Sequence, residues 1–181
     1  MTRHSEDDAL VDMARHNRIL SALPDRALNA IVSMATVHKL EFGRILYRQN
    51  NSMPAVYFPI TGVVSILVGD SQDADVELAI VGNEGLVGIT AALGVSRALG
   101  RAVVQIPGQA ILLSRKQFQD VLRTEDELSQ FIQRYIYLFL RQVMQSGACI
   151  QLHTAVERCA RWLLMAHDRA GADEFRIPRA S

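Results

Sequence analysis

YFPITGVVSI, residues 57–66, is the stretch that decides the fold class. It holds two apolar runs, separated by Thr61-Gly62. Valine, isoleucine, tyrosine and phenylalanine favour extended backbone and glycine interrupts it, so we expect two short strands, 56–60 and 63–68. Similar runs predict further strands at 37–40, 45–47, 76–81, 102–106 and 110–113, with a type II turn at Pro107-Gly108. Short strands interrupted this often indicate an antiparallel sandwich or jelly roll rather than a βαβ fold.

Helical segments flank these strands. Apolar residues follow Pro24 at helical spacing, so the chain up to about residue 36 is expected to be helical. Residues 82–100 are rich in Gly and Ala and predict a loop with a short helix. After the strands, three residue pairs have the spacing of a capping box, in which a hydroxyl and a side chain three residues later satisfy the free amides of a helix start. These pairs are Ser114 with Gln117, Thr124 with Glu127, and Thr154 with Glu157.

Segment 124–154 contains no Pro and only one Gly, and it predicts a helix about 40 Å long. Two apolar rows run along it. The first, Leu128, Phe131, Tyr135 and Leu138, continues through the polar Gln142 and Gln145, and the second consists of Ile132, Ile136, Phe139 and Val143. Such wide apolar coverage suits a helix buried on two sides. We therefore expect a homodimer formed as a coiled coil through this helix, with the first row as its interface. The alternative is one wide stripe buried within a single chain.

Charge and apolar content limit the possible partners. Lys plus Arg and Asp plus Glu are 19 each, so the net charge is zero, which argues against strong nucleic-acid binding by this chain alone. The N-terminus lacks the apolar core of a signal peptide, and no apolar run is long enough to cross a membrane. We expect a cytoplasmic protein without a membrane partner.

The sequence contains few residues or motifs that would indicate an enzyme or a metal site. The five histidines are 4, 16, 38, 153 and 167, so the strand region beyond residue 38 has no imidazole for a metal-dependent jelly-roll enzyme. No nucleophile elbow, phosphate loop or zinc-protease motif is present. Cys149 and His153 could share a helix face and ligate a haem or metal, or simply pack at a hinge, and two ligands alone make an incomplete site. No catalytic activity, cofactor or metal is expected.

The order of these segments and three motifs resemble the Crp/Fnr family of transcription regulators over about residues 17–172. Residues 57–66 are similar to the family's strand–Gly–strand signature. Glu84-Gly85-Leu86-Val87-Gly88 lies where the family has its phosphate-binding cassette, and residues 156–164 resemble the first helix of its winged-helix domain. The resemblance implies a cyclic-nucleotide-binding-like antiparallel β-roll with flanking helices and a long dimerisation helix. It also implies a sensor for a small-molecule effector that regulates transcription.

The cassette departs from the pattern of members that bind cyclic nucleotides. Those members carry Phe-Gly-Glu and, about ten residues later, Arg-Ser-Ala or Arg-Thr-Ala, where Arg binds the phosphate and Glu a ribose hydroxyl. Gly88 and Arg101 match that pattern, but Ile89 replaces the Glu and Ala102 the hydroxyl residue. Glu84 could substitute for the Glu, and Arg97 and Arg101 could hold an anion or lie solvated at the surface. We therefore expect negligible affinity for cyclic AMP.

The resemblance also implies a division of the chain. We expect a sensor domain at 1–123, the dimerisation helix and hinge at 124–153, and the incomplete start of a winged-helix domain at 154–181. Phe175-Arg176-Ile177-Pro178-Arg179 does not resemble the family's DNA-reading helix. DNA is therefore expected as a partner only if further residues supply that helix. The alternative is a stand-alone small-molecule-binding or dimer-partner protein without a direct DNA role.

Overall fold

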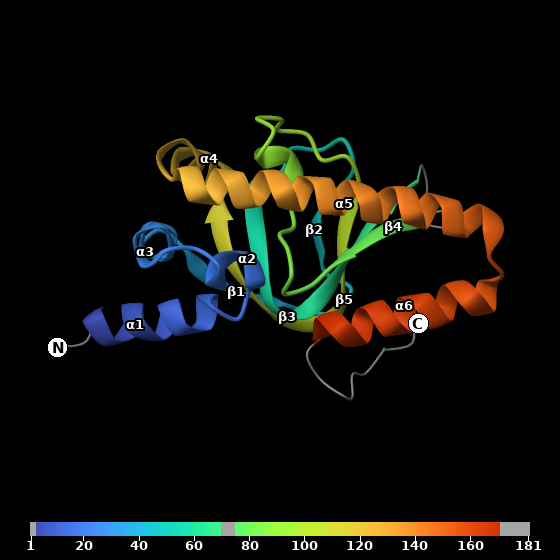
Figure 1. Cartoon of the computed structure of the whole chain (residues 1–181), viewed down its shortest axis with the longest axis horizontal. Helices are drawn as coiled ribbons and strands as arrows, with labels where there is room; N and C mark the ends of the chain where they lie inside the picture. Colours follow the sequence, from blue (N-terminus) through green and yellow to red (C-terminus); the bar gives the residue numbers. More distant parts are fainter. Residues whose placement is uncertain (1–2, 70–74, 171–181) are drawn as a thin grey trace.

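The computed structural model describes residues 3–69 and 75–170. Three helices open the chain, and a sheet region with one short 3-10 helix and three further helices follow (Figure 1). The helices are α1 (Arg3–Ala14), α2 (Arg18–Ser21), α3 (Asp25–Val32), η1 (Ile89–Ala91), α4 (Arg115–Thr124), α5 (Asp126–Leu152) and α6 (Ala155–Ala170). The strands are β1 (Thr36–Leu40), β2 (Ile45–Tyr47), β3 (Ala55–Val68), β4 (Val76–Val81) and β5 (Arg101–Ser114).

All strand pairs are antiparallel. The sheet has the order β1-β5-β3-β4, and β2 pairs with β5 beside this path. An antiparallel β fold with flanking helices is therefore confirmed. The short helix expected within 82–100 is also present, as η1.

Two predicted strand breaks are wrong. β3 runs through Gly62 and β5 runs through Pro107-Gly108, so each is one strand of 14 residues. The pairing of β3 with β5 shifts register around Thr61 and Val63, which marks a bulge where both strands bend together. A Cβ atom on Gly108 would lie 2.2 Å from the Thr61 carbonyl oxygen. Here Gly108 allows close backbone approach instead of forming a turn.

The main core lies between the sheet and the helices α2 to α5. Leu28, Phe58, Phe118 and Leu128 are fully buried in it, and the rings of Phe58 and Phe118 meet edge to face with centroids 6.0 Å apart. Two of the three expected capping boxes form. Ser114 and Gln117 begin α4, and Thr154 and Glu157 exchange hydrogen bonds at the start of α6.

The Thr124–Glu127 capping box is absent. The Thr124 hydroxyl donates to carbonyl oxygens of its own helix, and α5 begins after Glu125 without a side-chain cap. The long helix itself is present as α5, with 27 residues.

The first predicted row on α5 serves mainly the protomer's own core. Leu128 and Tyr135 are buried in that core, and the Gln142 amide donates to the Ile80 carbonyl of β4, 3.0 Å away. These three residues, predicted for the dimer interface, are thus already in contact with the sheet side of the same chain. Phe131 is half-buried, whereas Leu138 and Gln145 are exposed.

Helix α6 folds back along the sheet, antiparallel to α5 (Figure 1). Its Ala166 packs in a small apolar cluster with Val63, Ile80 and Ile106 of the strands, and Trp162 and Met165 cover that cluster. The expected features of 171–181, including Phe175–Arg179, lie outside the described residues. No helix in the described part of the chain is long and apolar enough to cross a membrane.

Candidate effector cavity

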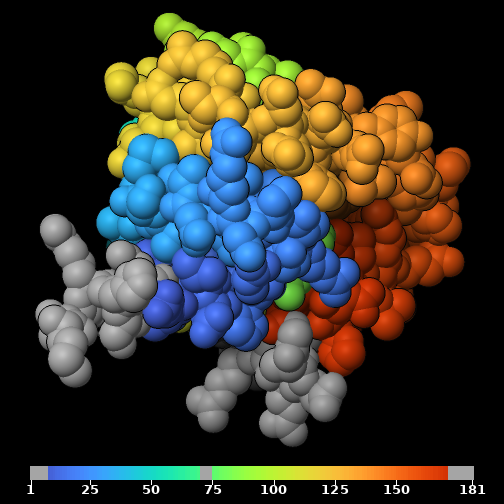
Figure 2. Space-filling view, turned by 60° about the vertical axis from the view of Figure 1, so that its left-hand side comes forward, coloured from blue at the N-terminus to red at the C-terminus, as the bar shows by residue number. Residues whose placement is uncertain are grey.

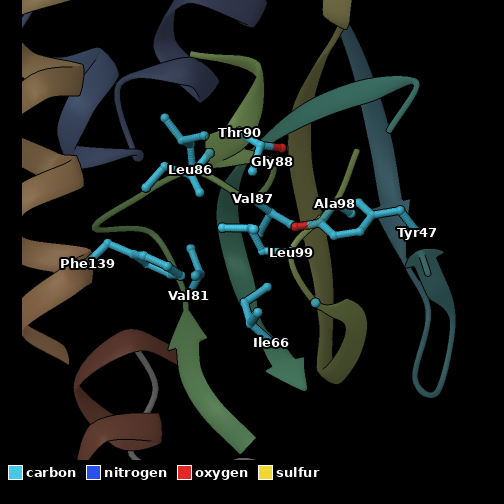
Figure 3. Close-up of a pocket in the computed structure, with 12 residues that line it drawn as sticks. Tyr47, Ile66, Val81, Leu86, Val87, Gly88, Thr90, Ala98, Leu99 and Phe139 are labelled. Atoms are coloured by element: carbon cyan, nitrogen blue, oxygen red, sulfur yellow. The ribbon is translucent and has the colours of Figure 1, made fainter. Parts of the chain in front are cut away.

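The segment 82–100 closes a small cavity against the sheet and α5 (Figure 3). Gly88, Ile89 and Thr90 form one wall, Ala98, Leu99 and Gly100 a second, and strand residues and Phe139 of α5 complete it. The cavity measures about 40 Å³, enough for a few water molecules and much less than a nucleotide occupies. A larger ligand therefore requires the loop or Phe139 to move.

The wall of the cavity is apolar. Among the described residues that line it, Tyr47 and Thr90 carry the only polar side-chain groups, and none is charged. The Thr90 hydroxyl lies 3.8 Å from the Met53 sulfur. Burial raises the pKa of the Tyr47 phenol well above its ordinary value, although a hydrogen bond with the Gly88 backbone acts in the opposite direction. Tyr47 is therefore a neutral hydroxyl, and the wall suits an uncharged ligand.

Gly88 is required where it lies. Its φ of 106° is a left-handed conformation that other residues rarely adopt, and an added Cβ would lie 3.0 Å from the Met53 sulfur. The turn it makes directs the backbone into η1 and places Ile89 in the cavity wall. The structure thus brings together Gly88 and Ile89 of the residues singled out from the cassette.

The remaining cassette residues lie outside the cavity. Arg101 forms a largely buried ion pair with Asp75, and the Arg97 guanidinium donates to the Asn50 carbonyl oxygen at 3.0 Å. Ala102 is buried in a neighbouring core cluster, and Glu84 pairs with Arg169 of α6 at 2.7 Å. Arg101 and Ala102, predicted as the ligand-contacting pair, therefore do not line this cavity. Ala98 and Leu99 stand at the cavity instead, so it has no guanidinium.

Asn17, Tyr135 and Phe139 have roles beside the loop that the sequence did not predict, although Tyr135 and Phe139 were named in the two predicted rows of the long helix. The Asn17 side-chain amide, fully buried, donates to the carbonyl oxygens of Pro59 at 2.9 Å and Gly85 at 2.8 Å. The Tyr135 hydroxyl donates to the Leu86 carbonyl oxygen at 3.2 Å. An added Cβ on Gly85 would lie 2.4 Å from the Tyr135 ring, which explains the small residue there. The third, Phe139, forms part of the wall, its ring 6.2 Å from that of Tyr135.

The two cysteines lie near the turn between α5 and α6. Cys149 is buried and accepts a 3.5 Å contact from the Gln145 amide, whereas Cys159 is exposed. His153 lies 3.7 Å from the Glu157 carboxylate. Among the described residues, no three His, Cys, Asp or Glu side chains gather closely enough to hold a metal ion.

A sheet closed by a Gly-rich segment with a short helix, and covered by a long helix, defines the class of cyclic nucleotide-binding domains. Residues 37–125 match the family model described as Cyclic nucleotide-binding domain. This part of the chain is thus similar to cyclic nucleotide-binding domains in sequence and in fold. A search of curated protein sequences gives no significant match.

Solved structures support the same fold. The chain is similar to the c-di-GMP-responsive global regulator CLP of Xanthomonas campestris, with 14% identity, a TM-score of 0.66, and coverage of 82% of this chain and 75% of that one. It is also similar to the catabolite activator protein of Thermus thermophilus, with 16% identity, a TM-score of 0.59, and coverage of 74% of this chain and 62% of that one. A third similar structure is the regulatory domain of Toxoplasma gondii protein kinase A with cAMP, with 16% identity, a TM-score of 0.54, and coverage of 67% of this chain and 46% of that one. The chain therefore spans only about half the length of that regulatory domain.

Proposed function

We propose that the chain is the effector-sensing and dimerising region of a Crp/Fnr-type transcription regulator, and that its effector is an uncharged, largely apolar small molecule. The observation that carries this proposal is that no charged residue is found among residues 3–69 and 75–170 that line the cavity, in a fold similar to cyclic nucleotide-binding domains. Cyclic nucleotides carry a phosphate, and a buried anion without a cationic or hydrogen-bonding partner is costly. The cavity wall supports an apolar occupant instead.

The geometry suggests how occupancy of the cavity reaches the rest of the molecule. Phe139 forms the cavity wall, and the same helix binds the loop backbone through Tyr135. A ligand larger than the present volume would displace Phe139 or the 98–100 segment. Either movement changes the contact between the cassette loop and α5, which is the element proposed to join two chains.

The proposed dimer surface is the outer face of α5. Three exposed apolar residues, Tyr137, Leu140 and Met144, follow one another at helical spacings of three and four, and Leu138 lies beside them. Two of them, Tyr137 and Met144, are 63% and 75% exposed, which is unusual for large apolar side chains on one helix face. A second copy of the chain packed along this face would cover them. DNA reading belongs, in the Crp/Fnr family, to a helix that follows the region equivalent to α6.

Native mass spectrometry of freshly purified protein tests this proposal directly, since it reports subunit count and bound ligand together. We expect a dimer of the 20.1 kDa chain, and a small-molecule adduct that leaves when the protein is denatured. Replacing the cavity-wall residue Ala98 by Phe should abolish the adduct, while Ala160→Phe on the exposed face of α6 should retain it. A monomer without an adduct, or an adduct identified as a cyclic nucleotide, would contradict the proposal.

A further inference from the structure

A second cleft, distinct from the apolar cavity, lies between α2, α5 and α6. Its volume is about 560 Å³. Figure 2 views the side of the molecule on which the blue N-terminal helices, the orange α5 and the red α6 meet. Four arginines from three helices line the cleft, with Glu84 and Tyr135 between them: Arg18, Arg141, Arg161 and Arg169.

The charge in this cleft is unbalanced. Glu84 is its one acidic lining residue, so the lining is three charges more positive than negative, although the whole chain has a net charge of zero. Glu84 is also already engaged, because its carboxylate accepts from Arg169 at 2.7 Å with both side chains largely buried. One arginine is thus neutralised and three remain.

The three remaining guanidinium groups have donors to spare. Among the described residues, Arg18 and Arg141 have exposed side chains without a hydrogen-bonding or ionic partner. Arg161 makes only a long contact of 3.5 Å with the Ser146 hydroxyl. A guanidinium presents five donors in a planar fork that matches phosphate oxygens. A single exposed arginine is commonly just solvated, but convergence of positions 18, 141 and 161 on one concavity favours a common anionic partner.

We propose that this cleft binds a compact anion of the phosphate class with at least two negative charges. It fits a small molecule better than a nucleic-acid backbone, since the arginines surround a hollow between helices instead of following a convex surface. Anion binding at this cleft does not require the effector proposed for the apolar cavity. The two sites are nevertheless adjacent, because Phe139 lines both.

Binding at this cleft would link two parts of the molecule. Arg161 and Arg169 belong to α6, whereas Arg18 and Arg141 belong to the helices that cover the sheet. An anion held by both sets would bridge α6 to the sensor domain and stabilise its docked position. Anion binding should therefore raise the melting temperature of the protein as well as give heat in a titration.

Calorimetric titration of the 181-residue chain with inorganic pyrophosphate, at constant ionic strength, tests the proposal. Saturable binding is expected, and Arg141→Gln and Arg18→Gln should each weaken it about tenfold through loss of one charge-assisted contact. Both residues are exposed, so neither change should disturb folding. Arg134→Gln is the matched control, since Arg134 is an exposed arginine on α5 that does not line the cleft. It should change the affinity less than about twofold.

Three results would overturn the proposal. The first is no saturable binding of pyrophosphate by the unmodified chain at millimolar concentration. The second is equal weakening by Arg134→Gln and Arg141→Gln, which would indicate only the general field of the protein. The third is tight binding of a DNA duplex that pyrophosphate does not displace and Arg141→Gln weakens, which would assign the arginines to nucleic acid.

Discussion

Asn17 connects three parts of the molecule through one buried side chain. Its Oδ1 accepts from the backbone N–H groups of Ile19 and Leu20, which caps α2, and its Nδ2 donates to the carbonyl oxygens of Pro59 and Gly85. The first of those carbonyls belongs to β3 and the second to the cassette loop. One amide therefore fixes the loop relative to both the helix and the sheet, which no residue with only donors or only acceptors could do.

Asn17→Ala should destabilise the protein by roughly 3 kcal/mol, because a lost buried hydrogen-bond partner costs about 1–3 kcal/mol and several groups lose theirs here. Chemical denaturation followed by circular dichroism measures the change. Asn29→Ala, at an exposed position of α3, is the control and should change stability by less than about 0.5 kcal/mol. Equal stability of the two variants would contradict the role assigned to Asn17.

Only some of the cassette residues that the sequence predicted for ligand binding line the cavity. Gly88 and Ile89 were predicted from their match to the cassette of the family that the sequence resembles, and both line the cavity. Arg101 could not be excluded from the residues alone, because spacing in a loop does not reveal which residue begins the next strand. Arg101 is the first residue of β5 and pairs with Asp75, and it does not line the cavity.

At the scale of elements, the positions of apolar runs were predictable but the continuity of strands was not. All seven predicted strand segments fall within β1 to β5. Gly62 and Pro107-Gly108 are typical of turns. The local sequence of either segment does not show that the two lie opposite each other in neighbouring strands. In the sheet they do: Gly62 lies against the Ile106 carbonyl and Gly108 against the Thr61 carbonyl, where any larger residue would collide. Because β3 and β5 pair at these positions, the two expected turns are instead one bend that both strands share.

The docking of α6 on the sheet depends on a buried carboxyl group. Glu77 of β4 is hydrogen-bonded to the Ser65 hydroxyl and the Trp162 indole of α6. Burial raises the pKa of Glu77 above its ordinary value of 4.5, and these two hydrogen bonds oppose but do not cancel that effect. The folded protein therefore binds this proton more tightly than the unfolded chain. Glu77 favours the fold below about pH 4.5, and stability is lost as the pH rises through the raised folded pKa.

Glu77→Gln should remove this loss, since an amide keeps an acceptor for both partners and does not ionise. We expect the variant to be more stable than the unmodified protein at pH 7 and to lose that advantage towards pH 4, as measured by thermal unfolding at several pH values. Glu157→Gln provides a control of opposite sign, because hydrogen bonds from the Thr154 backbone and side chain lower the Glu157 pKa. A Glu77→Gln advantage that does not change with pH would contradict this reading.

For the molecule as a whole, the long helix was predictable and its orientation was not. Apolar residues cover so much of α5 that sequence periodicity left two rows as candidates for a partner chain. The sheet buries Leu128 and Ile132, one from each row, and leaves a third row of Tyr137, Leu140 and Met144 on the outside. Which row faces the sheet depends on the rotation of α5 about its axis, which is set by contacts such as Tyr135 with Leu86.

Met144→Glu should weaken the proposed homodimer about a hundredfold, because packing against a second chain would bury an unpaired carboxylate. Size-exclusion chromatography with light scattering over a range of concentrations measures the change. Leu164→Glu, an equally exposed apolar position on α6, is the control and should leave the dimer intact. If Met144→Glu has no effect while Leu164→Glu dissociates the dimer, the interface lies on α6 instead of α5.

Calorimetric titration with cyclic AMP tests the central claim most directly, since it asks whether a cyclic nucleotide-binding domain has lost its phosphate site. A cavity without a guanidinium forgoes charge-assisted hydrogen bonds of roughly 1.5–3 kcal/mol, about ten- to a hundredfold in affinity. Its apolar wall further disfavours the ribose hydroxyl groups near Ile89. We therefore predict no saturable heat at micromolar cyclic AMP. Saturable micromolar binding that Arg97→Ala or Arg101→Ala abolishes would contradict the claim, because it would show that the loop rearranges to bring an arginine into the cavity.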